Sequence, residues 1–167
     1  MGRERIKYSK TALLCGLVST AICFSIRILT ESPFDMIHKL NCASLLPPIW
    51  LFNLLSILWG FLFGYAAGLV IRQSANRGTH TCILLSAYRG GLCYLCAFFL
   101  SCAWYPLLFG AGRLFIAFLV AFWATVFSAL CALCWFRVSS SATLIVAAYT
   151  LWMVYVFCLL FIVFFKN

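Results

Sequence analysis

Five apolar runs, each long enough to cross a lipid bilayer as a helix, constrain this chain of 167 residues more than any other feature. A bilayer core of about 30 Å needs about 20 apolar residues in helical conformation. Helices also satisfy every backbone N–H and C=O group within the segment, as the bilayer interior requires. The sequence therefore predicts an all-α integral membrane protein, a bundle of five transmembrane helices that forms a single domain over residues 1–167. We expect the helices at residues 11–29, 49–71, 90–109, 114–136 and 142–165.

The composition excludes several other classes of protein. Only 9% of the residues are charged and 66% are hydrophobic, whereas a soluble domain carries roughly 25% charged residues. The net charge of +9 comes from basic residues that gather at the ends of the apolar runs, where they meet lipid phosphates. Nucleic-acid binding would need a basic stripe along a folded face instead. We therefore expect the lipid bilayer as a partner and no nucleic acid, and we exclude a cytosolic enzyme.

The distribution of the basic residues predicts the orientation of the chain. Eight of the twelve lie on the side of the amino terminus and four on the opposite side. The positive-inside rule then places the amino terminus in the cytosol and the carboxyl terminus outside, in the plasma membrane if the source is bacterial. A cleavable signal peptide is an alternative for the first run. Because this run is long and no clear small-x-small cleavage site follows it, we expect a retained span.

The connection at residues 30–46 is longer and more polar than the others. A long polar loop beside the mouth of a helix bundle is a candidate lid over a binding site. An ordinary connection between two helices has the same sequence features, and the pattern does not choose between them.

Three tryptophans, Trp59, Trp123 and Trp152, lie near the middle of their spans rather than at the membrane interfaces. A mid-membrane indole has an N–H group to satisfy, so we expect it to face protein or a ligand rather than lipid. Phe63 lies one turn from Trp59, and Tyr149 shares a face with Trp152. Aromatic faces on two helices could form the walls of a flat apolar slot, or they could pack as an ordinary core.

Three glycines, Gly60, Gly64 and Gly68, lie on one stripe of the second helix. Glycines spaced by four residues let another helix approach backbone to backbone. The stripe therefore predicts close helix packing, either at a dimer face or within one protomer.

The ionisable and sulfur-containing residues give little sign of acid-base or metal chemistry. The acidic residues Glu4, Glu31 and Asp35 all lie outside the spans, and His38 and His80 lie in loops. A proton-coupled transporter usually carries a carboxylate inside the membrane, and no Ser-His-acid set can be assembled there. We expect the cysteines to act as small hydrophobic side chains rather than metal ligands. Most lie inside apolar runs: Cys15, Cys23, Cys93, Cys96, Cys102, Cys131, Cys134 and Cys158.

Several motifs over residues 46–167 together resemble the translocator protein / tryptophan-rich sensory protein family (TspO/MBR), also known as the peripheral benzodiazepine receptor family. Residues 47–52 read P-P-I-W-L-F, residues 59–63 read W-G-F-L-F, and residues 104–109 read W-Y-P-L-L-F. Phe136-Arg137-Val138-Ser139 follows, with Tyr149 and Trp152 at the family's spacing. The order and spacing of these motifs carry the resemblance.

The resemblance implies a five-helix bundle, often a homodimer, with a pocket closed by the first loop. Members of the family bind tetrapyrroles such as protoporphyrin IX and haem, and eukaryotic members also bind cholesterol. By position, the candidate ligand-binding residues are Trp59, Phe63, Ser101, Trp104, Tyr149 and Trp152. The propionates of a porphyrin could pair with Arg27 or Lys39 at the mouth. The tetrapyrrole is a ligand here, and we expect no required cofactor and no metal.

We therefore interpret the chain as a membrane-embedded receptor or sensor for a flat lipophilic molecule, a tetrapyrrole above all. One rival function is a light-dependent enzyme that degrades porphyrins in the same pocket. Others are a small transporter or exporter of a porphyrin or sterol, and a structural protein without a ligand. The departures from the family pattern affect ligand specificity, because hydrogen-bonding groups set it in an apolar pocket. Ser101 replaces a usual Asn, and Ala97 stands where Gln is common.

Overall fold

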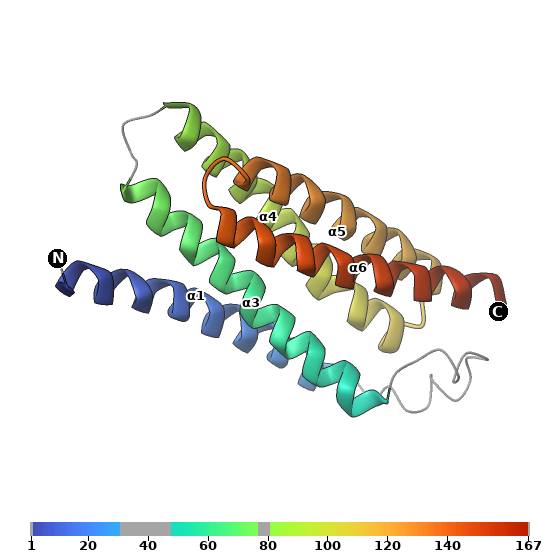
Figure 1. Ribbon diagram of the computed structural model, residues 1–167. Helices are drawn as coiled ribbons and strands as arrows, with labels where there is room; N and C mark the ends of the chain where they lie inside the picture. Colours follow the sequence, from blue (N-terminus) through green and yellow to red (C-terminus); the bar gives the residue numbers. More distant parts are fainter. Residues whose placement is uncertain (1, 31–47, 77–80, 167) are drawn as a thin grey trace.

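The computed structural model describes residues 2–30, 48–76 and 81–166, and within these ranges the chain folds into five helices (Figure 1). Each of the five is long and apolar enough to cross a membrane, which confirms the predicted fold class. The helices are α1 (Gly2–Leu29), α3 (Ile49–Asn76), α4 (Thr81–Phe109), α5 (Leu114–Trp135) and α6 (Ser140–Lys166). The predicted loop at 30–46 lies almost wholly outside the described residues.

The helices extend beyond the apolar runs at several ends. Helix α4 begins at Thr81 rather than at residue 90, and α3 continues to Asn76 rather than ending at residue 71. Arg89 and Arg72 therefore lie inside helices, although sequence reasoning treated such charges as boundaries. A long basic side chain near a membrane interface can reach water while its backbone stays helical, so the charge does not end the helix.

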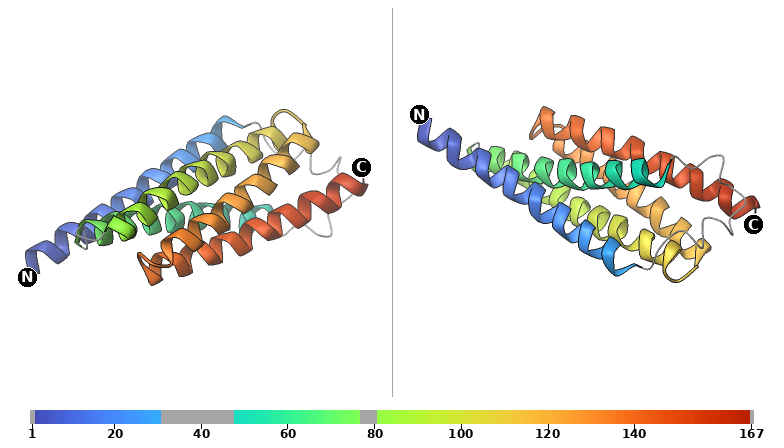
Figure 2. Two further views of the ribbon diagram at one scale, coloured as in Figure 1. Left: turned by 90° about the horizontal axis from the view of Figure 1, so that it is seen from above. Right: turned by 90° about the horizontal axis from the view of Figure 1, so that it is seen from below.

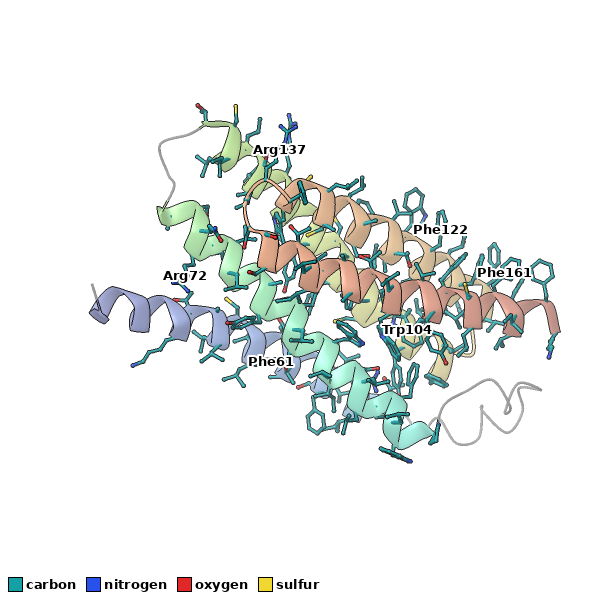
Figure 3. All side chains as sticks on the ribbon, viewed as in Figure 1. Phe61, Arg72, Trp104, Phe122, Arg137 and Phe161 are labelled. Atoms are coloured by element: carbon teal, nitrogen blue, oxygen red, sulfur yellow. The ribbon has the colours of Figure 1, made fainter. Side chains whose placement is uncertain are left out.

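Neighbouring helices follow one another around the bundle in the order α1, α3, α6, α5, α4. Helix α1 packs densely along α3, and α5 lies between α4 and α6. Helix α1 also runs beside α4, as the view from below shows (Figure 2), but it touches α4 at few points. The two ends of the chain lie at opposite ends of the bundle (Figure 1). Arg72 and Arg137 lie toward the end that carries the amino terminus (Figure 3).

Small residues allow α5 to pack closely against its two neighbours. Ala117, Ala121, Ala124, Ser128 and Cys131 are fully buried, and their spacing of three and four residues places them on one face of the helix. Since lipid tails are as apolar as the side chains, association of helices in a membrane depends on close van der Waals packing. The alanine face supplies this packing, and the opposite face of α5 is left for lipid.

The glycine stripe of α3 faces α1 of the same chain. A Cβ atom at Gly64 would lie 2.6 Å from the backbone oxygen of Cys15, and one at Gly60 would lie 3.3 Å from Cys23 Sγ. A Cβ atom at Gly68 would collide with the backbone of Ala12. Of the two alternatives for this stripe, the structure shows an internal contact. A homodimer would therefore have to use another surface.

Candidate functional site

A cavity of about 60 Å³ lies between α1, α3, α4 and α6, in the half of the bundle where α1 ends and α3 begins. Trp104 lies between α3 and α6 in Figure 3, on the inner side of the bundle. The cavity lies within a hydrophobic core that also includes Phe52. It is lined by Cys23, Ile26, Arg27, Ser56, Trp59, Gly60, Phe63, Phe98, Ser101, Cys102, Trp104, Tyr105, Tyr149, Trp152 and Met153.

The structure brings almost all of the predicted site residues to this one cavity. The cavity is lined by the six residues that the family resemblance predicted for ligand binding. It is also lined by one of the two basic residues predicted for the mouth of the pocket. These residues are Trp59, Phe63, Ser101, Trp104, Tyr149, Trp152 and Arg27. Lys39, the second predicted mouth residue, lies outside the described residues.

Aromatic rings form two groups along the cavity. Tyr149 is at the centre of one group, with its ring stacked on Phe63 at 4.2 Å between centroids and in edge contact with Trp59 at 6.2 Å. Phe52 is at the centre of the other group, 5.5 Å from Trp152 and 6.1 Å from Trp104. Such pairs add about 0.5–1.5 kcal/mol beyond the burial of their area. The rings hold each other in place, and Trp59, Phe63, Trp104, Tyr149 and Trp152 line the cavity.

One hydroxyl pair supplies hydrogen-bonding capacity inside this aromatic wall. The Tyr149 hydroxyl donates to Ser101 Oγ, joining α6 to α4, and Ser101 donates to the backbone oxygen of Ala97 at 2.6 Å. Tyr149 is only 5% exposed, so an unpaired hydroxyl there would be costly. Ser101 thus preserves a polar contact in the cavity although the family's amide is absent.

Arg27 is the one charged side chain among the described residues that line the cavity. Its guanidinium donates to the side-chain oxygen of Asn53 on α3 and lies 4.4 Å from the ring centroid of Tyr105 on α4. The ring of Phe52 lies 6.0 Å away. These partners are neutral, so they hold the cation by hydrogen bonding and cation–π attraction without neutralising it. An anionic ligand group near this end of the cavity would meet a full positive charge.

Sequence reasoning missed several cavity residues, including Cys23, Cys102 and Tyr105. It treated the cysteines as packing residues, yet Cys23 Sγ and Cys102 Sγ lie 3.8 Å apart on the cavity wall. Cys23 precedes Arg27 by four residues, and this spacing places both on one face of α1. That spacing is the signal that could have identified Cys23. Nothing in the local pattern pairs it with Cys102 on a helix so far along the chain.

Trp123 differs from the other two mid-span tryptophans. It is 49% exposed on the outer surface, where its ring contacts Phe122 and Phe127. The expectation that its indole faces protein or a ligand was wrong. Helix α5 turns its alanine face inward to pack closely, so the bulky Trp123 is left on the lipid side. Trp59 and Trp152 are partly buried and line the cavity.

A second hollow of about 790 Å³ lies between α3 and α4 in the other half of the bundle. Its walls include Ala67, Val70, Tyr88, Gly91 and Leu92, and none of the described residues that line it is charged. Several of these side chains are half-exposed or more, among them Tyr88 at 66% and Leu92 at 48%. It is therefore a broad apolar groove that opens toward lipid, and we call it the α3–α4 groove.

Comparison with known proteins agrees with this architecture. A model of the TspO/MBR family matches residues 12–165, nearly the whole chain, including the first helix that the sequence motifs did not cover. A search of the curated proteins found no match. Since the family match spans all five membrane helices, the chain belongs to the TspO/MBR family.

Proposed function

We propose that this protein is a membrane-embedded receptor or sensor that binds a tetrapyrrole, such as protoporphyrin IX or haem, in the aromatic cavity. The observation that carries the proposal is the convergence of Trp59, Tyr149 and Trp152 on a cavity that Arg27 also lines. Membership of the TspO/MBR family supports a membrane sensor or binder of tetrapyrroles in general. The particular ligand is part of the proposal.

The chemistry of a porphyrin matches the groups in the cavity. Its ring is a flat apolar disc that stacks on indole and phenol rings, here those of Trp59, Trp152 and Tyr149. Its propionates are anionic and form charge-assisted hydrogen bonds with a guanidinium such as that of Arg27. The Ser101–Tyr149 hydroxyl pair offers a further polar contact at the wall. Stacking then supplies binding energy, and the arginine sets the orientation of the ring.

The cavity must open to admit such a ligand. Its volume is about 60 Å³, whereas ligand pockets typically hold roughly 300–1,000 Å³. The described conformation is therefore a closed one, and binding selects a state in which the walls have separated. The affinity that is measured is then lowered by the fraction of molecules in the open state.

Equilibrium titration of the purified protein tests the proposal. Protoporphyrin IX, haem and a sterol are titrated separately, with octaethylporphyrin as a ring that lacks propionates. We expect saturable binding of the two propionate-bearing tetrapyrroles, and weaker binding of octaethylporphyrin because it cannot use Arg27. Absence of saturable binding of either tetrapyrrole would contradict the proposal. Preference for the sterol would assign the cavity to a different lipophile.

Light-dependent porphyrin breakdown is a second candidate function. It is favoured by the indoles of Trp59 and Trp152, which are oxidisable side chains on the cavity wall. Both complexes are illuminated in the presence of oxygen at equal porphyrin occupancy. The porphyrin should then bleach faster in the wild-type complex than in the Trp59→Leu complex. Equal bleaching of both complexes would leave binding as the function.

We also propose a homodimer with a cytosolic amino terminus, in the plasma membrane if the source is bacterial. The bias of basic residues toward the amino-terminal side supports this orientation. Reporter fusions test it: an alkaline phosphatase at the carboxyl terminus should be active, and an inactive one would reverse the orientation. Mass measurement of the detergent-solubilised protein tests the dimer. The glycine stripe is covered by α1, so replacing Gly64 should not act through dimer formation.

A further inference from the structure

Three side-chain contacts join helix α1 to α4. On α1 the contacting residues are spaced by four, so they lie on a single face of the helix. We call this set of contacts the α1–α4 seam. It comprises the hydroxyls of Ser19 and Tyr94 at 3.3 Å, the sulfurs of Cys23 and Cys102 at 3.8 Å, and Arg27 over the ring of Tyr105 at 4.4 Å.

The seam is the most sparsely packed interface between helices that are neighbours around the bundle. Along α3, the backbone of α1 fits against glycines where even one added methyl group would collide. Along α4, the contacts of the seam are between side chains, and α1 and α4 share fewer contacts than any other two neighbouring helices of the bundle. Among helices that are neighbours around the bundle, α1 and α4 would therefore lose the fewest contacts on separating. Four of the six seam residues, Cys23, Arg27, Cys102 and Tyr105, also line the cavity.

The two central sulfurs are close enough to react with each other. A disulfide bond is about 2.0 Å long, so Cys23 Sγ and Cys102 Sγ must approach by about 1.8 Å from their present 3.8 Å. Rotation of the two side chains and a small shift of loosely packed helices can provide this approach. Both thiols are free in the structure and only partly buried.

We propose that Cys23 and Cys102 are a modification site, a reversible disulfide that ties α1 to α4 across the cavity wall. With a hydroperoxide as oxidant, one thiolate attacks the peroxide oxygen and releases hydroxide or alkoxide, which leaves a sulfenic acid. The second thiol attacks the sulfenic sulfur, the S–S bond forms, and water leaves. The two thiols lose two electrons and two protons in total, and the hydroperoxide is reduced to water and its alcohol, or to two waters for hydrogen peroxide. A dithiol reverses the step.

The disulfide would control access to the cavity, a consequence that rests on the proposed function. A bond between α1 and α4 holds the α1–α4 seam at its closed spacing, and the closed cavity is too small for a tetrapyrrole. The reduced protein is then the form that takes up the ligand, and the oxidised protein excludes it.

Peptide mapping tests the disulfide itself. The wild-type protein in lipid nanodiscs is treated with hydrogen peroxide, its free thiols are alkylated, and it is digested without reduction. We expect a linked pair of peptides that contains Cys23 and Cys102. Its mass should be two hydrogens below the sum of the two separate peptides, and it should disappear after treatment with a dithiol. Cys102→Ala should abolish the pair. Cys96→Ala, on the exposed face of the same helix, should retain it. Complete alkylation of Cys23 and Cys102 after oxidation would overturn the proposal.

Protoporphyrin IX titration of the same samples tests the control of access. We expect oxidation to weaken binding at least tenfold in the wild type and in Cys96→Ala, and to leave Cys102→Ala unchanged. A linked protein that binds as tightly as the reduced one would overturn the control of access. A reduced protein that binds no porphyrin would overturn the proposed function, while the peptide map would still decide for or against the disulfide.

Discussion

The cavity and the α3–α4 groove occupy opposite halves of one bundle and differ in nearly every property. The groove has a volume of about 790 Å³ and the cavity about 60 Å³. The groove is lined by half-exposed apolar side chains such as Leu92, without a charged residue among those described. The cavity has a cation, a hydroxyl pair and two groups of aromatic rings.

Volume alone therefore does not identify a ligand site in a membrane protein. Any lipid-facing groove fills with acyl chains, which need neither a partner for charge nor a particular orientation. Binding pockets instead have a few polar groups that fix the orientation of the ligand. By that criterion the small cavity, with its cation and hydroxyl pair, is the stronger candidate site, and the large groove without a charged residue among those described is the weaker one.

The largest expected effect concerns packing, which is close between α1 and α3 and open in the α3–α4 groove. In Gly64→Leu, the new side chain would meet the backbone oxygen of Cys15 and force α1 from α3. We expect a loss of about 3 kcal/mol in the free energy of unfolding, the upper end of the usual cost of overpacking. Gly91→Leu in the groove is the matched control, because nothing lies within 4 Å of a Cβ atom there. Denaturant titration in mild detergent measures the free energy of unfolding of both variants. Equal losses of unfolding free energy would refute the difference in packing.

The next largest effect is loss of the cavity's positive charge. Arg27→Met retains an apolar stem but removes the partner for a propionate. Hydrogen bonds to charged groups contribute about 1.5–3 kcal/mol, so protoporphyrin IX affinity should fall about 10- to 150-fold. Octaethylporphyrin, which has no propionates, should bind the variant and the wild type equally. Arg72→Met, at the other end of the bundle, should bind protoporphyrin IX as the wild type does.

A smaller effect is expected from the tryptophans. Trp59→Leu and Trp152→Leu each remove one stacking face, worth about 0.5–1.5 kcal/mol, so affinity should weaken about two- to twelvefold for each. Trp123→Leu is the control, since this indole is half-exposed on the outer surface. Fluorescence of the bound porphyrin measures the affinities. If Trp123→Leu weakens binding as much as the other two, the cavity is not where the ring lies.

The five helices could be predicted from the sequence because length and apolar composition are sufficient to specify a membrane span. Helix ends were less predictable, since Arg72 and Arg89 extend toward water from within a helix and look like boundaries in the sequence. Of the site, the residues nominated by resemblance lie together, and Arg27 lies with them. Their contact depends on the order of helices around the bundle, which no local pattern encodes.

Two features of the site could not be predicted for a related reason. Trp123 is mid-span like Trp59, and only the alanine face that α5 uses for packing decides which way it points. Cys23 and Cys102 look like ordinary small hydrophobic residues, and their proximity follows from the seam between α1 and α4. Contacts between distant helices are three-dimensional information that periodicity within one helix does not contain.

The smallest expected effect concerns the groove. Gly91→Phe places a ring in the α3–α4 groove from a position where nothing lies within 4 Å of a Cβ atom. If the groove is not the ligand site, protoporphyrin IX affinity should change by less than about twofold, or less than about 0.4 kcal/mol. A loss of tenfold or more would reverse the comparison and assign the ligand to the groove.

A crystal structure of the reduced protein with zinc protoporphyrin IX would show directly where the ligand binds. We expect a ring between Trp59 and Trp152, with a propionate at Arg27, an anomalous peak for zinc inside the ring, and α1 displaced from α4. A ring located in the α3–α4 groove, beside Tyr88 and Leu92, with the cavity still closed, would contradict this expectation.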